Sequence, residues 1–479
     1  MKTASSTISF VLGNEMVNLD LDDTFGNTPI TTVLNFLRSR PGFTGSKEGC
    51  AEGDCGACTV VLGSLSDGQI AYTAIDACLV FLPMLHGKQL LTVEHLGSSS
   101  DLHPVQSAMI KTDGSQCGYC TPGFVMSLLA LYKNHNQPSK EVVEDALTGN
   151  LCRCTGYRSI AEAAALSCNN EGKDHFTENE DEIIGLLAHI HKAGIAINTD
   201  KHQYFRPASL SEALQIKKST PEVLLINGAT DIALRVTKLK EDLPAILDLG
   251  NVPELKAVGM DENGYYIGAG VALETVKEMV KERLPALYDM LAVFGSKQIR
   301  ELATLGGNIG SASPIGDLPP VLMAYNAKIV LASSDGEREI PMRDFITGYR
   351  TTQRTELEII KSITIPYPGE HIEVRSYKIS KRKDLDISTV SGGFSIGRDK
   401  DGLVTEICLA YGGMAALTKR AARTEAALLG KAWNRKNIEA AMNLVDEDFE
   451  PISDARAQAE GRAVMARNLI MKFWTDTMR

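Results

Sequence analysis

The distribution of cysteine limits what this chain can fold into more than any other sequence feature. Ten cysteines occur, and only Cys408 lies beyond residue 168. The N-terminal residues show no secretory pattern, and no run of 18 apolar residues is present, so we expect a cytoplasmic location. Thiols stay reduced in that compartment, so dense cysteines there favour metal or redox chemistry over disulfides.

Length and charge narrow the functional classes further. A chain of 479 residues predicts about three or four domains. Hydrophobic residues make up 44% and charged residues 23%, which is typical of globular proteins. The net charge is −11 and no long Lys/Arg run occurs, so neither nucleic acid nor an anionic membrane surface is an expected partner.

The first cysteine set follows the spacing C-x4-C-x2-C…C, with members Cys50, Cys55, Cys58 and Cys78. Plant-type ferredoxins hold a 2Fe-2S cluster with this spacing. Glycines before and between these cysteines permit the sharp turns that such a loop needs, and they leave backbone N–H groups free to point at the cluster. A zinc site or buried thiols are the alternative, but zinc sites usually show two C-x2-C-type pairs.

The second set combines a C-x2-C pair with a C-x-C pair, and its members are Cys117, Cys120, Cys152 and Cys154. This spacing alone suits either zinc or a second 2Fe-2S cluster. We expect each pair to precede a helix, with Cys120 before Pro122 and Cys154 before a helix over 159–166. Helix N-termini offer N–H groups and a positive dipole end to a negatively charged cluster.

The patterning divides the chain into five parts. Residues 1–88 are β-rich, with a hairpin turn at Gly13-Asn14 and a helix within 31–38. The helical part, 89–167, is expected to carry helices at 104–111, 122–132, 140–147 and 159–166. Next come a polar, acidic linker, an α/β part and an α+β part, at 168–202, 203–370 and 371–479.

No G-x-G-x-x-G follows a strand, so a Rossmann dinucleotide site is disfavoured. Two other segments suit a phosphate-bearing cofactor. In 223–232 a strand runs into Gly228, and Thr230 or Asp231 opens a helix whose N–H groups suit a pyrophosphate; a plain strand–helix turn fits equally well. Segment 303–317 is rich in small residues and glycine, so it reads either as a loop that approaches a ligand closely or as an unusual structural loop.

Four motifs together resemble the xanthine dehydrogenase family, and within it the iron–sulfur and FAD subunit of bacterial two-chain enzymes. They are GCAEGDCGAC at 49–58, QCGYCTPG at 116–123, GNLCRCTGYR at 149–158 and LGGNI at 305–309. The resemblance covers nearly the whole chain in the family's domain order. It implies a multidomain α+β protein: a β-grasp ferredoxin-like domain, a helical-bundle 2Fe-2S domain, an FAD-binding domain of vanillyl-alcohol-oxidase (PCMH) type, and a C-terminal domain like that of the CO dehydrogenase flavoprotein.

The resemblance also implies site residues. Its two 2Fe-2S clusters fall on the two cysteine sets. Its FAD contacts fall on Leu224, Leu225, Ile226, Asn227, Gly228, Ala229, Thr230, Asp231, Phe294, Thr304, Leu305, Gly306, Gly307, Asn308, Asp317, Ile360 and Lys378. Phe294 is expected to stack on adenine. No catalytic residue is implied, because the family oxidises its purine at a molybdenum cofactor on a domain that this sequence lacks.

The implied function is therefore an electron relay in purine catabolism. Electrons from hypoxanthine or xanthine are expected to leave a molybdenum-binding large subunit, pass the helical-domain cluster, the ferredoxin-like cluster and FAD, and reach NAD+. A heterotetramer of two small and two large chains is the implied assembly. Two alternatives stand: the same relay in a molybdenum hydroxylase that acts on an aldehyde or another N-heterocycle, and a non-redox zinc-binding interaction protein.

Overall fold

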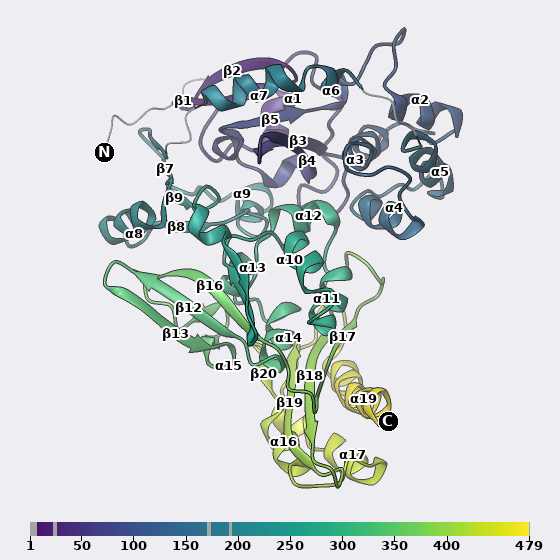
Figure 1. Cartoon of the computed structure of the whole chain (residues 1–479), viewed down its shortest axis with the longest axis vertical. Helices are drawn as coiled ribbons and strands as arrows, with labels where there is room; N and C mark the ends of the chain where they lie inside the picture. The colour runs from purple at the N-terminus through teal and green to yellow at the C-terminus, as the bar shows by residue number, and fades with distance from the viewer. Residues whose placement is uncertain (1–6, 23–25, 170–173, 191–193, 479) are drawn as a thin grey trace. The chain divides into compact units, whose positions relative to one another are not determined.

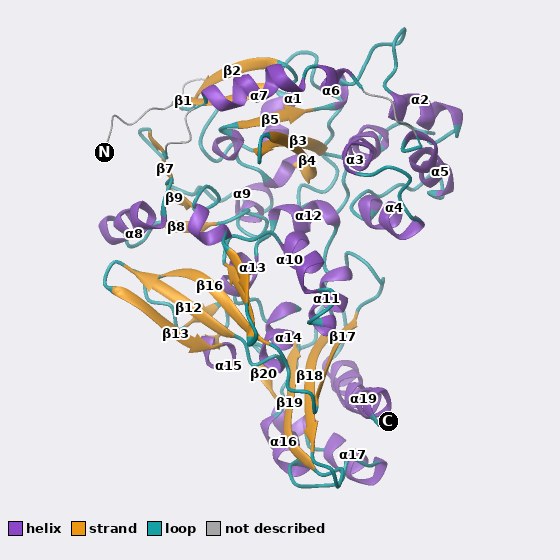
Figure 2. Cartoon of the chain, in the orientation of Figure 1, coloured by secondary structure: helices purple, strands orange, loops and turns teal. Residues whose placement is uncertain are grey.

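The computed structural model describes residues 7–22, 26–169, 174–190 and 194–478. The chain forms two compact units. Unit 1 comprises 1–216, 222–252 and 296–303, and unit 2 comprises 217–221, 253–295 and 304–479. Figure 1 follows the chain from its N-terminus, and Figure 2 marks its helices and strands. Among the described residues, no helix combines the length and the apolar character needed to cross a membrane.

A five-stranded sheet in the order β2-β1-β5-β3-β4 is central to unit 1. Its strands are β1 (Thr7–Leu12), β2 (Glu15–Asp20), β3 (Thr59–Ser66), β4 (Gln69–Asp76) and β5 (Lys88–Leu91). Neighbours are antiparallel except β1 and β5, which are parallel. The predicted hairpin and the helix α1 (Val33–Arg38) are both present. The sheet continues past residue 88, the end predicted for the first domain.

Alternation along the strands gives this sheet two buried faces. Phe10 and Val60 lie in one core with α1, whereas their neighbours Val11 and Val61 lie in a second core with the helices that follow. The first core also contains Tyr204 from a second sheet of unit 1. That sheet has the order β6-β7-β9-β8, with β6 (Ile195–Asn198), β7 (Gln203–Arg206), β8 (Leu224–Ile226) and β9 (Ala245–Asp248).

Four helices form the helical part of unit 1, as predicted: α2 (Pro104–Lys111), α3 (Thr121–Asn134), α4 (Lys140–Leu147) and α5 (Arg158–Ser167). They lie together in Figure 1, with α3 against β3 and the other three against α3. Two short 3-10 helices, η1 (Ala77–Leu79) and η2 (Leu82–Leu85), lie between β4 and β5, and a third, η3 (Val93–His95), lies between β5 and α2.

The acidic segment 168–202, predicted as a linker, carries regular structure: α6 (His175–Glu178), α7 (Glu180–His189) and β6. Ile183 and Leu187, one turn apart, are buried in the second core of unit 1, and the Asp174 side chain caps α6. Acidic residues in the first turn of α7 stabilise its N-terminus, which explains why a polar composition conceals a helix. Whether the segment separates two domains stays a prediction.

The remaining helices before residue 303 are α8 (Leu210–Ser219), α9 (Ala233–Thr237), α10 (Leu273–Val280), α11 (Pro285–Ala292) and α12 (Lys297–Leu302). Of these, α9 and α12 belong to unit 1, and α10 and α11 to unit 2. The α12 side chains of Gln298 and Arg300 are fully buried. Arg300 forms an ion pair with Asp145 of α4, with 2.6 Å between Nη2 and Oδ1.

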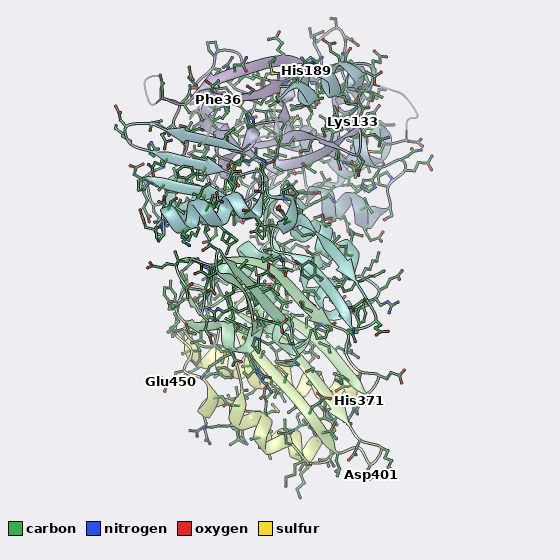
Figure 3. All side chains as sticks on the ribbon, turned by 60° about the vertical axis from the view of Figure 1, so that its left-hand side comes forward. Phe36, Lys133, His189, His371, Asp401 and Glu450 are labelled. Atoms are coloured by element: carbon green, nitrogen blue, oxygen red, sulfur yellow. The ribbon has the colours of Figure 1, made fainter. Side chains whose placement is uncertain are left out.

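Unit 2 contains three sheets, in the orders β10-β11-β16-β12-β13, β14-β15 and β17-β18-β19-β20. Their strands are β10 (Val258–Met260), β11 (Gly264–Gly268), β12 (Lys328–Ser333), β13 (Gly336–Pro341), β14 (Ile346–Gly348), β15 (Thr351–Thr352), β16 (Ile359–Pro366), β17 (Ile372–Ile379), β18 (Val390–Arg398), β19 (Val404–Gly412) and β20 (Lys419–Arg420). Figure 3 labels Asp401 in the exposed turn between β18 and β19.

The helices of unit 2 complete its layers. They are α13 (Leu305–Gly310), α14 (Leu318–Ala324), α15 (Met342–Phe345), α16 (Ala422–Leu428), α17 (Arg435–Met442), α18 (Val445–Asp448) and α19 (Ala459–Thr477), with η4 (Pro253–Lys256) before β10. A third core joins β17–β19 to the C-terminal helices through Phe394, Tyr411 and Phe473. The part at 371–479, predicted as α+β, thus contains strands followed by helices.

Candidate functional site

The side chains of the eight cysteines of the two predicted sets lie in four neighbouring pairs, all within unit 1. Cys50 pairs with Cys55 and Cys58 with Cys78; in the second set, Cys117 pairs with Cys154 and Cys120 with Cys152. All of them are free thiols. Tertiary structure thus brings Cys78 to the loop of the first set, and it joins the two halves of the second set.

The loop around Cys50 surrounds the sulfur with backbone N–H groups. The Cys50 Sγ accepts hydrogen bonds from Glu52 N at 3.4 Å and Asp54 N at 3.3 Å. The hydrogen bond shared with the Cys55 thiol is the largest cause that lowers the pKa of Cys50 to about 6. Ala51 and Gly53 have positive φ values of 56° and 77°, which turn these N–H groups inward as an anion-binding nest.

The other pair of the first set is buried. Cys58 and Cys78 are 2% and 1% exposed, and the carboxyl group of Asp76 beside them is fully buried. Cys58 Sγ donates to Asp76 Oδ1 over 3.8 Å. Burial raises the pKa of the Asp76 carboxyl well above its ordinary value. The first set therefore combines two partly exposed thiols, Cys50 and Cys55, with two buried ones.

The second set lies nearer the surface, and Cys117 and Cys154 are exposed. Cys152 Sγ accepts hydrogen bonds from Cys154 N, Thr155 N and the Thr155 hydroxyl at 3.4, 3.4 and 3.2 Å. Partial burial opposes these bonds, but together they lower the pKa of the Cys152 thiol to about 7. Burial raises the pKa of Cys120 to about 12.

The helix starts predicted for this set are half correct. Cys120 is the N-cap residue of α3, as expected. The prediction for Cys154 is wrong in detail, because α5 begins at Arg158 and Tyr157 is its N-cap residue, with a φ of 69°. The left-handed Tyr157 separates the Cys154 loop from the helix, so the sulfur of Cys152 is bonded by the loop N–H groups instead.

Backbone contacts join the loops of the two sets. Leu151 N, next to Cys152, donates to Cys55 O over 3.0 Å. The Asn150 amide donates to Gly56 O and to the Thr59 hydroxyl, each over 3.1 Å. Asn150 lies within the GNLCRCTGYR motif at 149–158, but the motif does not indicate these contacts. Gln298, which donates a hydrogen bond to Asn150, lies in none of the sequence motifs described above.

The donor set fits iron–sulfide clusters. In the parts of the chain that the structure describes, no three His, Cys, Asp or Glu side chains converge as they do around a single metal ion. The eight thiols are instead arranged as two sets of two pairs. A 2Fe-2S cluster takes four thiolates, two for each iron, so each set offers the right number in the right grouping.

The first predicted flavin segment lies in unit 1. Leu224, Leu225 and Ile226 form β8, and Asn227 through Asp231 form the turn that follows. The helix α9 begins at Ala233 and not at Thr230 or Asp231, so that prediction is wrong. The reason is that Gly228 and Ala229 are both left-handed, with φ values of 84° and 61°, which delays the helix.

The left-handed backbone of this turn costs conformational free energy. A Cβ on Gly228 would lie 1.8 Å from the carbonyl oxygen of Leu302, so only glycine fits there. A left-handed alanine such as Ala229 costs roughly 1–2 kcal/mol, and the fold maintains it in a buried position. Such strain beside a strand end marks a candidate ligand-binding turn.

The second flavin segment lies in unit 2, and the loop predicted for it is in part a helix, α13. Thr304 is its N-cap residue and accepts from Gly307 N over 3.1 Å. Gly306 N donates to Ala269 O over 2.8 Å, and a Cβ on Gly306 would lie 2.4 Å from the Ala269 Cβ. This glycine therefore permits close backbone packing, and its N–H is not directed at a ligand.

The ligand-facing candidates on α13 are therefore side chains and later glycines. Within the described residues, the Asn308 side-chain oxygen is buried without a hydrogen-bond partner, which is unusual unless a bound group supplies one. Ile360 of β16 lies beside this helix, since a Cβ on Gly310 would be 3.3 Å from its Cδ1. Structure thus brings Ile360 and the 304–308 segment together inside unit 2.

Asp317 and Lys378 also meet inside unit 2. Their Oδ2 and Nζ atoms are 2.6 Å apart, and each side chain is 6% exposed. The Ser388 hydroxyl donates to the other Asp317 oxygen over 2.6 Å, a contact that the sequence did not suggest. Phe294 is half-buried just beyond α11, and its backbone N–H donates to Leu291 O.

Comparison with protein families assigns three parts of the chain. Residues 92–165 match a 2Fe-2S binding domain, residues 199–368 match the FAD binding domain in molybdopterin dehydrogenase, and residues 375–477 match the CO dehydrogenase flavoprotein C-terminal domain. The predicted multidomain α+β architecture and the presence of iron–sulfur and FAD-binding domains are therefore confirmed.

The similar curated proteins include xanthine dehydrogenases and an aldehyde oxidase. Xanthine dehydrogenase of Emericella nidulans is 34% identical over 98% of this chain and 39% of its own length. Xanthine dehydrogenase/oxidase of Gallus gallus is 32% identical over 100% and 40%, and aldehyde oxidase of Homo sapiens is 30% identical over 99% and 39%. The chain thus spans about two fifths of the length of these relatives.

Solved structures resemble part of the chain. Carbon monoxide dehydrogenase of Hydrogenophaga pseudoflava has a chain that is 26% identical, with a TM-score of 0.53 over 57% of this chain and 95% of that one. Quinoline 2-oxidoreductase of Pseudomonas putida 86 has a chain that is 26% identical, with a TM-score of 0.52 over 58% and 98%.

Proposed function

Because the chain belongs to the xanthine dehydrogenase family, we propose that it is the iron–sulfur and FAD subunit of a xanthine dehydrogenase. In this proposal it carries electrons from a molybdenum-cofactor partner that oxidises hypoxanthine or xanthine, and it delivers them to NAD+. The single observation that carries the proposal is the grouping of eight thiols into two sets of two pairs in unit 1.

The cysteines would hold the two clusters, Cys50, Cys55, Cys58 and Cys78 the first, and Cys117, Cys120, Cys152 and Cys154 the second. When bound, each cluster supplies one-electron transfer, and FAD collects single electrons and releases a pair. The chain contributes the N–H groups on the Cys50 and Cys152 sulfurs, which stabilise added negative charge. Leu151 and Cys55 keep the two loops in contact.

Candidate flavin-binding residues are present in each unit. In unit 1 these are Leu224 through Asp231, supported by the strained turn at Gly228 and Ala229. In unit 2 they are Phe294, Thr304 through Asn308, Asp317, Ile360 and Lys378, supported by the unpartnered Asn308 oxygen and the buried Asp317–Lys378 pair. Phe294 would stack on the adenine ring.

The partner proposal follows from chemistry. No described residue of this chain is proposed to oxidise a purine, so the proposed relay needs an electron source. We propose a separate molybdenum-binding large subunit in a heterotetramer of two small and two large chains. Cys117 and Cys154 are exposed, which supports a second cluster near the surface, where it would receive electrons.

A second candidate keeps the relay and changes the substrate to an aldehyde or another N-heterocycle. The similarity to human aldehyde oxidase and to quinoline 2-oxidoreductase favours it specifically. Substrate choice would reside in the partner, so substrate profiling of the co-purified complex decides between the candidates. NADH formation with xanthine supports the first, and turnover of aldehydes or quinoline-type rings alone supports the second.

The relay itself is tested by three cysteine substitutions in the full chain. The wild type is expected to bind about four irons, in two clusters, and one flavin. Cys55→Ser and Cys120→Ser are each expected to remove one cluster, halve the iron and leave the other cluster's electron paramagnetic resonance (EPR) signal. Cys168→Ser is the matched control, because Cys168 is a buried thiol outside both sets.

Two results would contradict the relay. One is a protein that binds zinc with no visible absorption, which favours the non-redox interaction protein. The other is loss of the same EPR signal in Cys55→Ser and Cys120→Ser, which would show that the eight thiols do not form two independent sets.

A further inference from the structure

Lys238 connects the segment matched to an FAD-binding domain with the loop of the first cysteine set. It follows α9 directly and belongs to the matched range 199–368. Its Nζ donates to Cys50 O over 3.0 Å and forms an ion pair with Glu52 Oε2 at 3.1 Å. Both contacts lie within unit 1. The flavin-type domain thus supplies a positive charge to the loop that carries the first cysteine pair.

A second observation places α9 beside the same set. A cavity of about 50 Å³ is lined by Cys78 of the first set, by Ala51 next to Cys50, and by Val236 and Thr237 of α9. The Thr237 hydroxyl is buried without a partner among the described residues. The end of α9 therefore faces the region between Cys50 and Cys78, and Lys238 continues that approach.

Lys238 brings a positive charge to a loop whose own charged side chains, between residues 48 and 58, are all acidic. Between residues 48 and 58 the loop carries Glu48, Glu52 and Asp54 and no basic side chain. The neighbouring Lys240 directs its Nζ to Thr237 O at 2.7 Å. An iron–sulfide cluster with four thiolates is anionic and gains a further negative charge on reduction, so a nearby cation favours the reduced form and a nearby carboxylate opposes it.

We propose that Lys238 and Glu52 act in opposite directions on the reduction potential of the cluster held by Cys50, Cys55, Cys58 and Cys78. This inference rests on the proposed function. Lys238 raises the reduction potential and Glu52 lowers it, so the two charges together shift the potential only slightly. Each side chain also holds the other against the loop. Lys238 is a positioning residue: it touches the Cys50 carbonyl and no proposed cluster atom.

The test is an EPR-monitored redox titration of the full chain with both clusters present. Lys238→Met is expected to lower the midpoint potential of the first cluster, and Glu52→Gln to raise it. Each shift is expected to be about three- to tenfold in the reduced-to-oxidised ratio, with 59 mV as the tenfold limit for one electron; partial exposure of both side chains keeps it moderate. The double variant is expected to return close to the wild type.

Three controls separate charge from structure. Lys238→Arg is expected to restore the wild-type potential. Arg235→Met removes a cation from α9 that pairs with Glu241, and it is expected to shift the potential much less. The second cluster, held by Cys117, Cys120, Cys152 and Cys154, serves as an internal reference whose midpoint stays constant in every variant.

Shifts of the same sign in Lys238→Met and Glu52→Gln would overturn the inference, because they would mean that the pair acts only by holding the loop. An unchanged midpoint in both would overturn it as well. If Lys238→Met fails to load the first cluster, the Glu52→Gln midpoint decides alone and must rise. Failure of the proposed function is distinct: it would appear as a wild type without either cluster signal.

Discussion

Gln298 of α12 donates a hydrogen bond from Nε2 to Asn150 Oδ1 over 3.1 Å, and both side chains are buried. The same Asn150 oxygen accepts from the Ser127 hydroxyl at 2.6 Å, while its amide nitrogen bonds to Gly56 O and to Thr59. One amide thereby joins α3, α12 and the loops before Cys152 and after Cys55. Because every atom of this amide is bonded in a dry site, the two cysteine loops are held in one relative position.

Gln298→Ala tests this network. The change removes the amide group whose two N–H donors are shared among Ser127, Ala146 O and Asn150. We expect a loss of about 1–3 kcal/mol in the free energy of unfolding of unit 1, measured by urea denaturation. Gln203→Ala is the control, because Gln203 is exposed on β7 and is expected to change stability by less than about 0.5 kcal/mol. Equal effects in both variants would contradict a special role for Gln298.

Gly56→Ala tests the contact between the two cysteine loops. Gly56 has a φ of 66°, and a Cβ there would lie 2.4 Å from Gly149 O and from the Asn150 amide. We expect impaired loading of both clusters, measured as iron content, because the loops cannot approach. Gly68→Ala isolates the backbone strain: Gly68 has a φ of 81° but no atom within 4 Å of its Cβ position, so iron content is expected to stay normal.

Lys378→Met tests the buried pair in unit 2. Removing the ammonium leaves the Asp317 carboxylate buried, with only the Ser388 hydroxyl on its other oxygen. Breaking such a buried pair costs about 3–5 kcal/mol, and we expect reduced flavin content and a lower melting temperature. Lys328→Met removes an exposed partner of Glu339 and is expected to cost about 0–1 kcal/mol with flavin unchanged. Normal flavin binding in Lys378→Met would remove this residue from the proposed site.

Asp174→Asn tests a buried ion pair and its pH dependence. Asp174 accepts from Lys133 Nζ at 2.6 Å and contacts His103 Nε2 at 3.0 Å, and Lys133 is labelled in Figure 3. Burial opposes ionisation of Asp174, but the hydrogen bonds from His103 and Lys133 outweigh it and hold its pKa well below the ordinary value. The carboxylate therefore stabilises the folded state above its unfolded pKa of about 3.9, and this contribution is lost as the pH falls through the folded pKa.

We accordingly expect Asp174→Asn to destabilise unit 1 by about 3 kcal/mol at pH 7, and the difference from the wild type to shrink as the pH falls below about 4. Urea denaturation at pH 7 and pH 3.5 measures both values. The exposed Asp181→Asn is the control. A destabilisation that stays constant across this range would show that packing around Asp174, and not its charge, is responsible.

Local sequence was sufficient wherever neighbours along the chain decide the structure. The C-x4-C-x2-C spacing places three thiols on one turn, and the apolar periodicity of α2–α5 predicted these helices to within two residues. It was insufficient at 303–317, where glycines suggested an open loop. There the backbone of Ala269, far away in sequence, packs against Gly306 and completes the first turn of α13. Similarly, the acidic stretch that forms α7 is helical because Ile183 and Leu187, on one face of it, are buried in a hydrophobic core.

By itself, the sequence determined which atoms are available: eight thiols in two spaced sets, glycines at the turns, and strands and helices with apolar faces. Only the tertiary structure decided which of these atoms meet. The pairing of Cys117 with Cys154, the bond from Gln298 to Asn150 and the approach of Lys238 to Cys50 each join residues separated by 37 to 188 positions. Such contacts depend on how two packed faces come together, and spacing along one segment carries no information about that geometry.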